Sequence, residues 1–227
     1  RKLYLANQDR IAQQVQHREA GEFKKDKLKV LAELTKLRQI CCDPRLHYED
    51  YKAGSAKLDT CMELVHGALD GGHRILLFSQ FTGMLDIIGK RLAKEDIAFL
   101  KLTGASSKES RAKMVAQFQA GEVPVFLISL KAGGVGLNLT AADVVIHYDP
   151  WWNVAAQDQA TDRAHRIGQQ HTVTVYKLIA KDTIEERIMQ MQESKRDLVN
   201  SVLGGDGISS ALFTREDVLA LLGGDGR

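Results

Sequence analysis

The stretch Ile75-Leu76-Leu77-Phe78 is apolar at every position, and two later stretches, Val125-Phe126-Leu127-Ile128 and Val144-Val145-Ile146, have the same character. A strand with one face in water alternates apolar and polar side chains. A strand of a parallel sheet is covered on both faces and is apolar throughout. The three stretches therefore predict buried, parallel strands.

The segments around these stretches have the apolar spacing of helices and further strands. In chain order we expect a helix over 56–69, a strand over 75–78, a helix over 82–94, a strand over 97–102, a helix over 107–120, strands over 125–129 and 144–146, a helix over 153–166, a strand over 172–179 and a helix over 182–202. Strands that alternate with helices of about 10–15 residues indicate βαβ units with right-handed crossovers. The sequence therefore predicts an α/β fold, a parallel sheet sandwiched by helices.

Two more helices are expected before the sheet, over 2–20 and 27–41, with Gly21 ending the first. Pro44 ends the second, because proline disfavours helical geometry in the residue before it. The expected division of the chain is a helical extension over 1–54, a sheet lobe over 55–203 and a tail with a short helix over 204–227.

The composition, 44% hydrophobic and 26% charged, excludes a wholly disordered or fibrous chain. The formal net charge is only +2, although residues 1–57 hold 13 basic and 8 acidic residues. A nearly neutral chain has no bulk field that attracts polyanions. Contacts to a nucleic acid must therefore come from donors at particular positions.

Three further observations narrow the class of protein. The cysteines, Cys41, Cys42 and Cys61, lack the spacing of a metal site and predict buried thiols in a reducing compartment. No stretch approaches the roughly 20 apolar residues of a transmembrane helix, and the first residues do not form a signal peptide. The chain begins at Arg1 without an initiator methionine, so we expect a piece of a longer protein.

The segment 129–139 places three glycines directly after a predicted strand. Glycine lets backbone amides approach a phosphate closely, because there is no Cβ in the way. Lys131 adds a positive charge to this loop and Asn138 a hydrogen-bond donor. A phosphate-binding loop and a plain tight turn are both consistent with this pattern.

The segment 158–169 carries Arg163 and Arg166, which share a face if the segment is helical. Two guanidinium groups side by side repel unless an anion lies between them, and their planar geometry suits phosphate oxygens. A surface pair bridged to Asp158 or Asp162 is the alternative interpretation.

Together, the glycine-rich loop, the strand and the arginine pair resemble the second RecA-like lobe of superfamily-two helicases, and in particular the Swi/Snf family of DNA-translocating ATPases. The resemblance covers about residues 27–200. The matching segments follow the family's order: a leading helix at 37–44, motif IV at 75–81, an intermediate motif at Leu102-Thr103-Gly104 with Arg111, motif V at 129–139, a tryptophan-bearing loop at 149–153 and motif VI at 159–169. Val154 stands where the family usually has proline.

The resemblance implies that Arg163 and Arg166 are catalytic, as arginine fingers on the β- and γ-phosphates of ATP bound by a first lobe. The nucleotide-binding positions that it implies are Gly134, Gly136, Asn138, Gln159 and Asp162. The implied contacts to DNA follow strand ends, at Gln80, Thr82, Thr103, Ser129, Lys131, Trp152 and Asn153. Such contacts to phosphates are not sequence-specific, and they weaken as salt rises.

Some of these positions have alternative roles. Thr103 and Ser106 are also suited to capping helix 107–120. Of the two adjacent tryptophans, Trp151 and Trp152, we expect one to pack in the core and one to face DNA.

The chain has no GxxxxGK[ST] segment and no acidic pair of the Walker-B type. We therefore expect this piece alone to be inactive and the first lobe to bind ATP and Mg²⁺, with no metal ligand in this chain. The expected partners are double-stranded DNA, the N-terminal ATPase lobe of the same protein and a DNA-bound target protein, with no membrane. The implied location is the bacterial cytoplasm, at the nucleoid, or the nucleus.

Three functions remain open at this stage. The first is one motor lobe of an ATP-dependent DNA translocase that remodels protein–DNA complexes. The second is the corresponding lobe of an RNA helicase of the DEAD-box kind. The third is a non-catalytic scaffold that binds nucleic acid.

Overall fold

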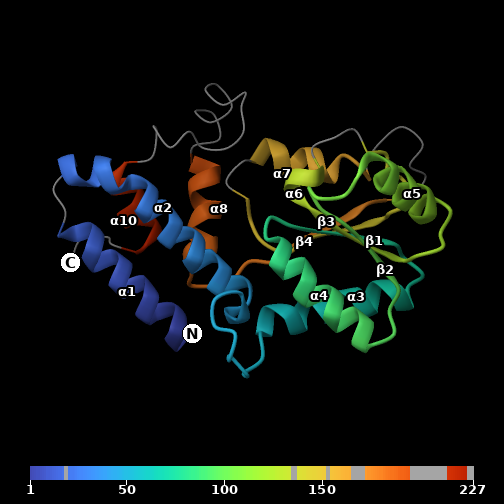
Figure 1. Cartoon of the computed structure of the whole chain (residues 1–227), viewed down its shortest axis with the longest axis horizontal. Helices are drawn as coiled ribbons and strands as arrows, with labels where there is room; N and C mark the ends of the chain where they lie inside the picture. Colours follow the sequence, from blue (N-terminus) through green and yellow to red (C-terminus); the bar gives the residue numbers. More distant parts are fainter. Residues whose placement is uncertain (18–19, 134–136, 152–153, 165–171, 195–213, 224–227) are drawn as a thin grey trace. The chain divides into compact units, whose positions relative to one another are not determined.

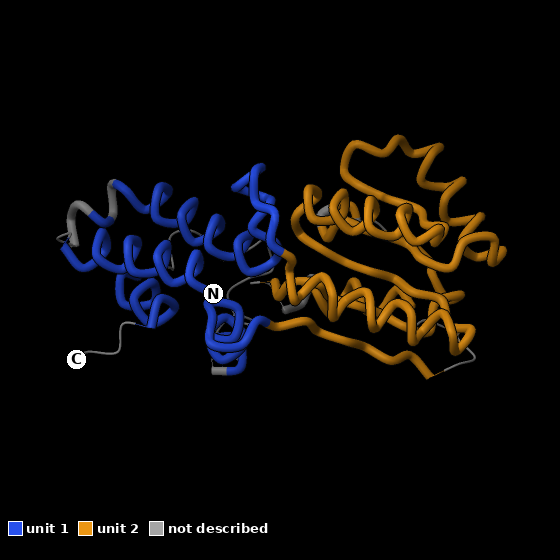
Figure 2. Tube along the Cα trace, turned by 90° about the horizontal axis from the view of Figure 1, so that it is seen from below, with its two compact units in different colours: residues 1–53, 180–227 blue, residues 54–179 orange. Residues whose placement is uncertain are grey.

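A computed structural model of the chain describes residues 1–17, 20–133, 137–151, 154–164, 172–194 and 214–223. By its internal contacts the chain divides into two compact units. Unit 1 consists of Arg1–Ala53 and Ala180–Arg227, and unit 2 of Gly54–Ile179, as Figure 2 shows. The grouping differs from the division expected from the sequence, which carried the sheet lobe to residue 203.

Unit 2 contains a parallel sheet in the strand order β2-β3-β1-β4-β5. The strands are β1 (Ile75–Ser79), β2 (Phe99–Leu102), β3 (Val125–Ser129), β4 (Val144–His147) and β5 (Thr174–Lys177). All residues of β1, β3 and β4 are buried, which confirms the prediction from their apolar stretches. The edge strand β5 is shorter than predicted and exposed along its whole length.

Helices cover both faces of the sheet, which confirms the predicted α/β fold. Figure 1 shows α3 and α4 on one face and α5, α6 and α7 on the other. Their bounds are α3 (Ala56–Asp70), α4 (Thr82–Lys94), α5 (Lys108–Gln119), α6 (Leu130–Gly133) and α7 (Val154–Thr161). Helix α3 begins where the sequence predicts, because the Ser55 hydroxyl accepts a hydrogen bond from the Leu58 amide, 3.3 Å away.

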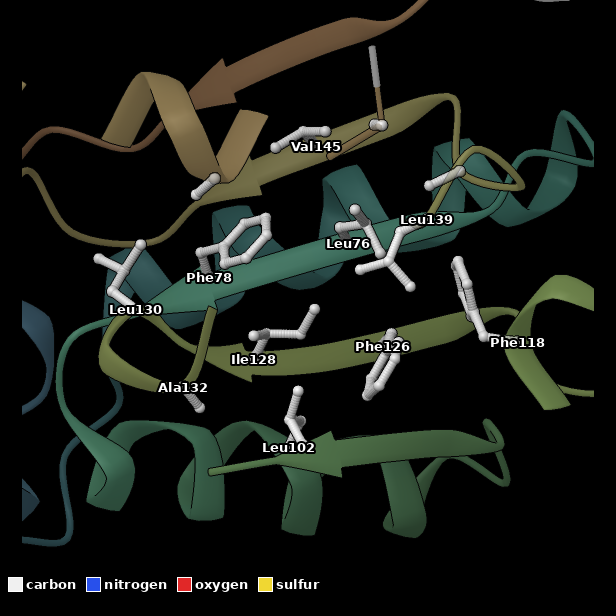
Figure 3. Close-up of a cluster of buried hydrophobic side chains, with 13 residues drawn as sticks. Leu76, Phe78, Leu102, Phe118, Phe126, Ile128, Leu130, Ala132, Leu139 and Val145 are labelled. Atoms are coloured by element: carbon white, nitrogen blue, oxygen red, sulfur yellow. The ribbon is translucent and has the colours of Figure 1, made fainter. Parts of the chain in front are cut away.

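The core under α5, α6 and α7 is a cluster of buried apolar side chains (Figure 3). Phe118 of α5 packs on Phe126 of β3, with ring centroids 5.4 Å apart. Leu130 and Ala132 of α6 belong to the same cluster, and Trp151 packs against it while partly buried. The core therefore fixes the segments that follow β3 and β4, where the sequence places its motifs.

Unit 1 is helical, with α1 (Lys2–Gln16), α2 (Ala20–Cys42), the short 3₁₀ helix η1 (Pro44–Leu46), α8 (Ile184–Ser194) and α10 (Arg215–Leu221). Tyr4 of α1 is buried, and its hydroxyl accepts a hydrogen bond from the Ile184 amide at 2.6 Å. Arg215 of α10 donates to the carbonyls of Val15 and Gln16, at the end of α1. Unit 1 therefore joins segments from the two ends of the chain.

Two predicted helix ends are wrong. Gly21 does not separate two helices, since α2 runs through it from Ala20 to Cys42. A glycine in a helix costs only about 1 kcal/mol, and buried side chains such as Leu34 and Leu37 offset that cost. Helix α7 ends at Thr161 and not at 166, and 162–164 form a turn. Helix α8 (Ile184–Ser194) lies within the helix predicted over 182–202. Residues 195–202 of that prediction lie outside the described residues.

Candidate functional site

The predicted DNA contacts follow the carboxyl ends of β1, β2, β3 and β4. Because the four strands are parallel, these ends lie at one edge of the sheet, the usual place for ligands in α/β folds. We call this the carboxyl edge. The structure places Gln80, Thr103 and Ser129 there, each directly after a strand or at its last residue, and Thr82 two residues beyond Gln80.

A buried carboxylate organises the carboxyl edge next to β1. Asp149 is 1% exposed, and its carboxylate accepts hydrogen bonds from the Ser79 hydroxyl at 2.5 Å and the Gln80 side-chain amide at 2.6 Å. The Gln80 amide also donates to the Pro150 carbonyl. The amide group predicted to contact DNA is thus already bound to the 149–150 loop. The sequence places Asp149 in the tryptophan-bearing loop but predicts no role for it.

The loop after β2 is closed by its own side chains. The Thr103 amide donates to the Ser106 hydroxyl at 3.2 Å, while the hydroxyl of Ser107 caps α5 by accepting from the Ser110 amide at 3.1 Å. Ser107 is therefore the residue that caps α5, and the predicted capping by Thr103 or Ser106 is wrong. Thr103 itself is half-buried.

Arg111 of α5 ties this loop to the segment after β3. Its guanidinium donates to the carbonyls of Ser106, Thr103 and Ala132, at 3.1, 3.4 and 3.5 Å. One side chain therefore fixes the spacing of two loops that carry predicted DNA contacts.

The glycine-rich segment begins as a short helix rather than a loop. Ser129 is 2% exposed, and its hydroxyl accepts a hydrogen bond from the Ala132 amide at the start of α6. Lys131 lies within α6, and Asn138 is exposed. Gly134 and Gly136 lie outside the described residues.

The arginine segment follows α7. Gln159 and Asp162 are exposed, whereas Arg163 is 1% exposed and lies in the turn after the helix. Arg163 is therefore not on the helical face that the sequence predicts for it. Arg166, with Trp152 and Asn153, lies outside the described residues.

The backbone joins the glycine-rich and arginine segments directly. The Leu139 amide donates to the Arg163 carbonyl at 3.1 Å, and the Arg163 amide donates to the Ala160 carbonyl at 3.4 Å. The sequence gives no signal for this contact, because the two residues are far apart in the chain.

A buried histidine lies beside these segments. His147, the last residue of β4, is 1% exposed, and burial together with the charge of Lys177 lowers its pKa to about 4. Sequence reasoning did not single it out. Within the described ranges there is no group of three or more His, Cys, Asp or Glu side chains that could hold a metal ion.

Comparisons with solved structures decide the family. The C-terminal domain of the Sulfolobus solfataricus SWI2/SNF2 ATPase is 31% identical, with a TM-score of 0.77, over 97% of this chain and 91% of that one. The chain is a C-terminal domain of the SWI2/SNF2 family. Residues 56–168 of this SWI2/SNF2 domain also match the family described as the helicase conserved C-terminal domain.

Further relatives of this SWI2/SNF2 domain include larger proteins. The Sulfolobus solfataricus SWI2/SNF2 ATPase core in complex with dsDNA is 34% identical, with a TM-score of 0.79, over 97% of this chain and 46% of that one. An uncharacterized ATP-dependent helicase of Mycoplasma pneumoniae is 40% identical over 97% of this chain and 21% of its own length. The chromatin-remodeling ATPase INO80 of Cryptococcus neoformans is 46% identical over 72% of this chain and 9% of its own length.

The SWI2/SNF2 domain thus spans about a fifth, or less, of the curated relatives that it matches. The resemblance seen in the sequence is confirmed. The chain corresponds to the C-terminal domain of the ATPases of this family, which includes chromatin remodelers. In the part of the chain that the structure describes, no helix is both long and apolar enough to cross a membrane.

Proposed function

We propose that this domain is the second motor lobe of an ATP-dependent translocase that moves along double-stranded DNA and remodels protein–DNA complexes. The first lobe binds ATP and Mg²⁺. This lobe contributes Arg163 and Arg166 to the β- and γ-phosphates, and its carboxyl edge contacts one DNA strand. The likeness to an ATPase core in complex with dsDNA supports the DNA substrate, and the likeness to INO80 supports the remodelling role.

The hydrogen bond between Leu139 and Arg163 is the observation that carries the proposal. It fixes the backbone of the glycine-rich segment to that of the arginine segment. A movement that brings the arginines to ATP therefore also moves the segment that contains Lys131 and Asn138. This is the coupling between nucleotide and DNA that a motor lobe needs.

The residues of this chain suit one wall of an ATP site. Guanidinium groups bind phosphate oxygens in pairs of hydrogen bonds, and the exposed Asn138 and Gln159 carry amide donors. Arg163 is covered in this structure, so its contact with a phosphate requires its side chain to become exposed when the lobes close. The bond that is broken is a phosphoryl bond of ATP, and the arginines stabilise the negative charge on the oxygens of the transferred phosphoryl group.

The test is Arg166→Ala in the full-length protein. Removal of an arginine finger lowers turnover by roughly 10³–10⁵-fold. We expect the DNA-stimulated ATPase rate to fall by this order while the Kd for duplex DNA stays within about twofold. The matched control is Arg91→Ala, which removes an arginine of α4 that pairs with Glu95 and leaves the carboxyl edge intact.

Normal turnover in Arg166→Ala would refute the assignment of the arginines. Stimulation by RNA rather than by duplex DNA would instead favour the RNA helicase function. Absence of any nucleic-acid-stimulated ATPase in the wild-type protein, with DNA binding retained, would favour a scaffold.

A further inference from the structure

His147 makes two contacts inside unit 2 that its place at the end of β4 does not require. Its ring stacks on Phe78 of β1, with centroids 5.5 Å apart and planes 20° apart. Its Nε2 lies 2.9 Å from the hydroxyl oxygen of Thr161, the last residue of α7. Within the part of the chain that the structure describes, its buried Nδ1 has no hydrogen-bond partner.

The direction of the hydrogen bond follows from the hydrogen-bonding capacity of Thr161 and of the other ring nitrogen of His147. A threonine hydroxyl has one proton, and the Gln157 carbonyl, 3.3 Å from this hydroxyl, can only accept. A proton on the buried Nδ1 of His147 would have no acceptor among the described residues, so the ring proton belongs on Nε2, which donates to the Thr161 oxygen. The Thr161 proton is then left to point to the Gln157 carbonyl. His147 is thus the neutral imidazole with its proton on Nε2 and with an unprotonated Nδ1 that needs no acceptor.

The same residues connect to the tryptophan-bearing loop. Gln157 is 2% exposed, and its side-chain oxygen accepts a hydrogen bond from the Trp151 amide at 3.2 Å. One turn of α7 therefore holds the loop through Gln157 and the strand β4 through Thr161.

The turn that carries Arg163 follows directly. The Arg163 amide donates to Ala160, one residue before Thr161, and the Arg163 carbonyl accepts from Leu139. The position of the end of α7 thus determines where the arginine turn begins. The bond between His147 and Thr161 links the end of α7 to the sheet through two side chains.

We propose that His147 is a positioning residue, which holds the end of α7 on the sheet so that a shift of the Trp151 loop is transmitted to the Arg163 turn. This inference rests on the proposed motor function. The inference adds to that function the contact that would connect the Trp151 loop to the arginine segment.

Three variants of the full-length protein separate this role from core packing. His147→Phe keeps an aromatic ring on Phe78 and removes the donor, and Thr161→Val removes the acceptor with little change of volume. His147→Gln replaces the ring by an amide that can still donate. His66→Phe, on the half-exposed His66 of α3, is the control for a histidine of the same unit outside this contact.

We expect His147→Phe and Thr161→Val each to lower the kcat of DNA-stimulated ATP hydrolysis by about tenfold, the factor associated with one buried hydrogen bond. The KM for ATP and the DNA-independent rate should change less than about twofold. The double variant should be no slower than either single one, because both remove the same bond. His147→Gln should recover most of the rate, and the His66→Phe control should match the wild type.

Hydrogen exchange of the same proteins gives a readout that does not depend on activity. The amides of residues 157–164 should exchange about tenfold faster in His147→Phe and Thr161→Val, with those of β1 and β3 unchanged. Unchanged exchange in both variants, or rate losses that add in the double variant, would overturn the inference. A wild-type protein without DNA-stimulated ATPase would overturn the proposed function, whereas the exchange result would still decide the contact.

Discussion

Lowering the pH should destabilise unit 2 through His147. Burial and the nearby charge of Lys177 lower the pKa of His147 from 6.5 to about 4. Lys177 lies on β5 directly opposite His147 in the sheet register, so a protonated ring would face a like charge. Its Nδ1 would also become a second buried donor.

The sign and size follow from proton linkage. Between pH 6.5 and pH 4 the unfolded chain binds a proton at His147 and the folded chain does not, so stability falls as the pH falls. A shift of about 2.5 pKa units corresponds to about 3.4 kcal/mol once the pH is well below 4. At pH 5 the loss relative to pH 8 is already about 2 kcal/mol.

Urea unfolding at pH 8, 6.5 and 5, followed by tryptophan fluorescence, measures this loss. Both tryptophans, Trp151 and Trp152, belong to the span of unit 2, so the signal reports on that unit. His147→Gln does not titrate in this range, and the difference between the two proteins removes the contribution of carboxylates and of other histidines. Equal losses of stability in the wild type and in His147→Gln would refute the reasoning.

Three further predictions concern stability. Asp149→Ala leaves the Ser79 and Gln80 donors without their acceptor and should cost about 3 kcal/mol of unfolding free energy in urea, whereas Asp158→Ala, at an exposed position, should change it by less than about 0.5 kcal/mol. Gly67→Ala should raise the free energy of unfolding by up to about 1 kcal/mol, because Gly67 lies within α3 with open space at its Cβ position. Gly121→Ala should lower it by about 1–3 kcal/mol, because Gly121 has a φ of +80° and its Cβ position lies against the Arg74 side chain. A stabilised Gly121→Ala or a neutral Asp149→Ala would contradict these explanations.

The central strands could be predicted from the sequence because each of them is covered on both faces. Val125–Ser129 and Ile75–Ser79 are fully buried, so their composition alone reveals their place in the sheet. The edge strand Thr174–Lys177 gives a weaker signal, since an exposed strand needs no continuous apolar stretch. Gly21 misled the prediction of a helix end because local propensity is small beside the burial of the remaining α2 side chains.

The candidate site was predictable as a set of segments but not as a set of contacts. The order of the glycine-rich, tryptophan-bearing and arginine segments resembles that of the SWI2/SNF2 family, and the comparisons confirm this family. The burial of Arg163 and Ser129 depends on how α6 and α7 pack on the sheet, which no local pattern encodes. Asp149 and His147 were missed for the same reason.

The polar residues of the candidate site fall into two physical sets. Asp149, His147 and Ser129 are buried, and the cost of removing them from water is offset only while their partners on the neighbouring loops stay in place. Thr82, Asn138 and Gln159 are exposed and meet no such condition. The first set therefore holds these segments to the sheet, and the exposure of the second set suits the ligand contacts that we propose. Arg163 belongs by burial to the first set and by sequence motif to the second, so in the function that we propose its side chain must become exposed before it can bind a phosphate.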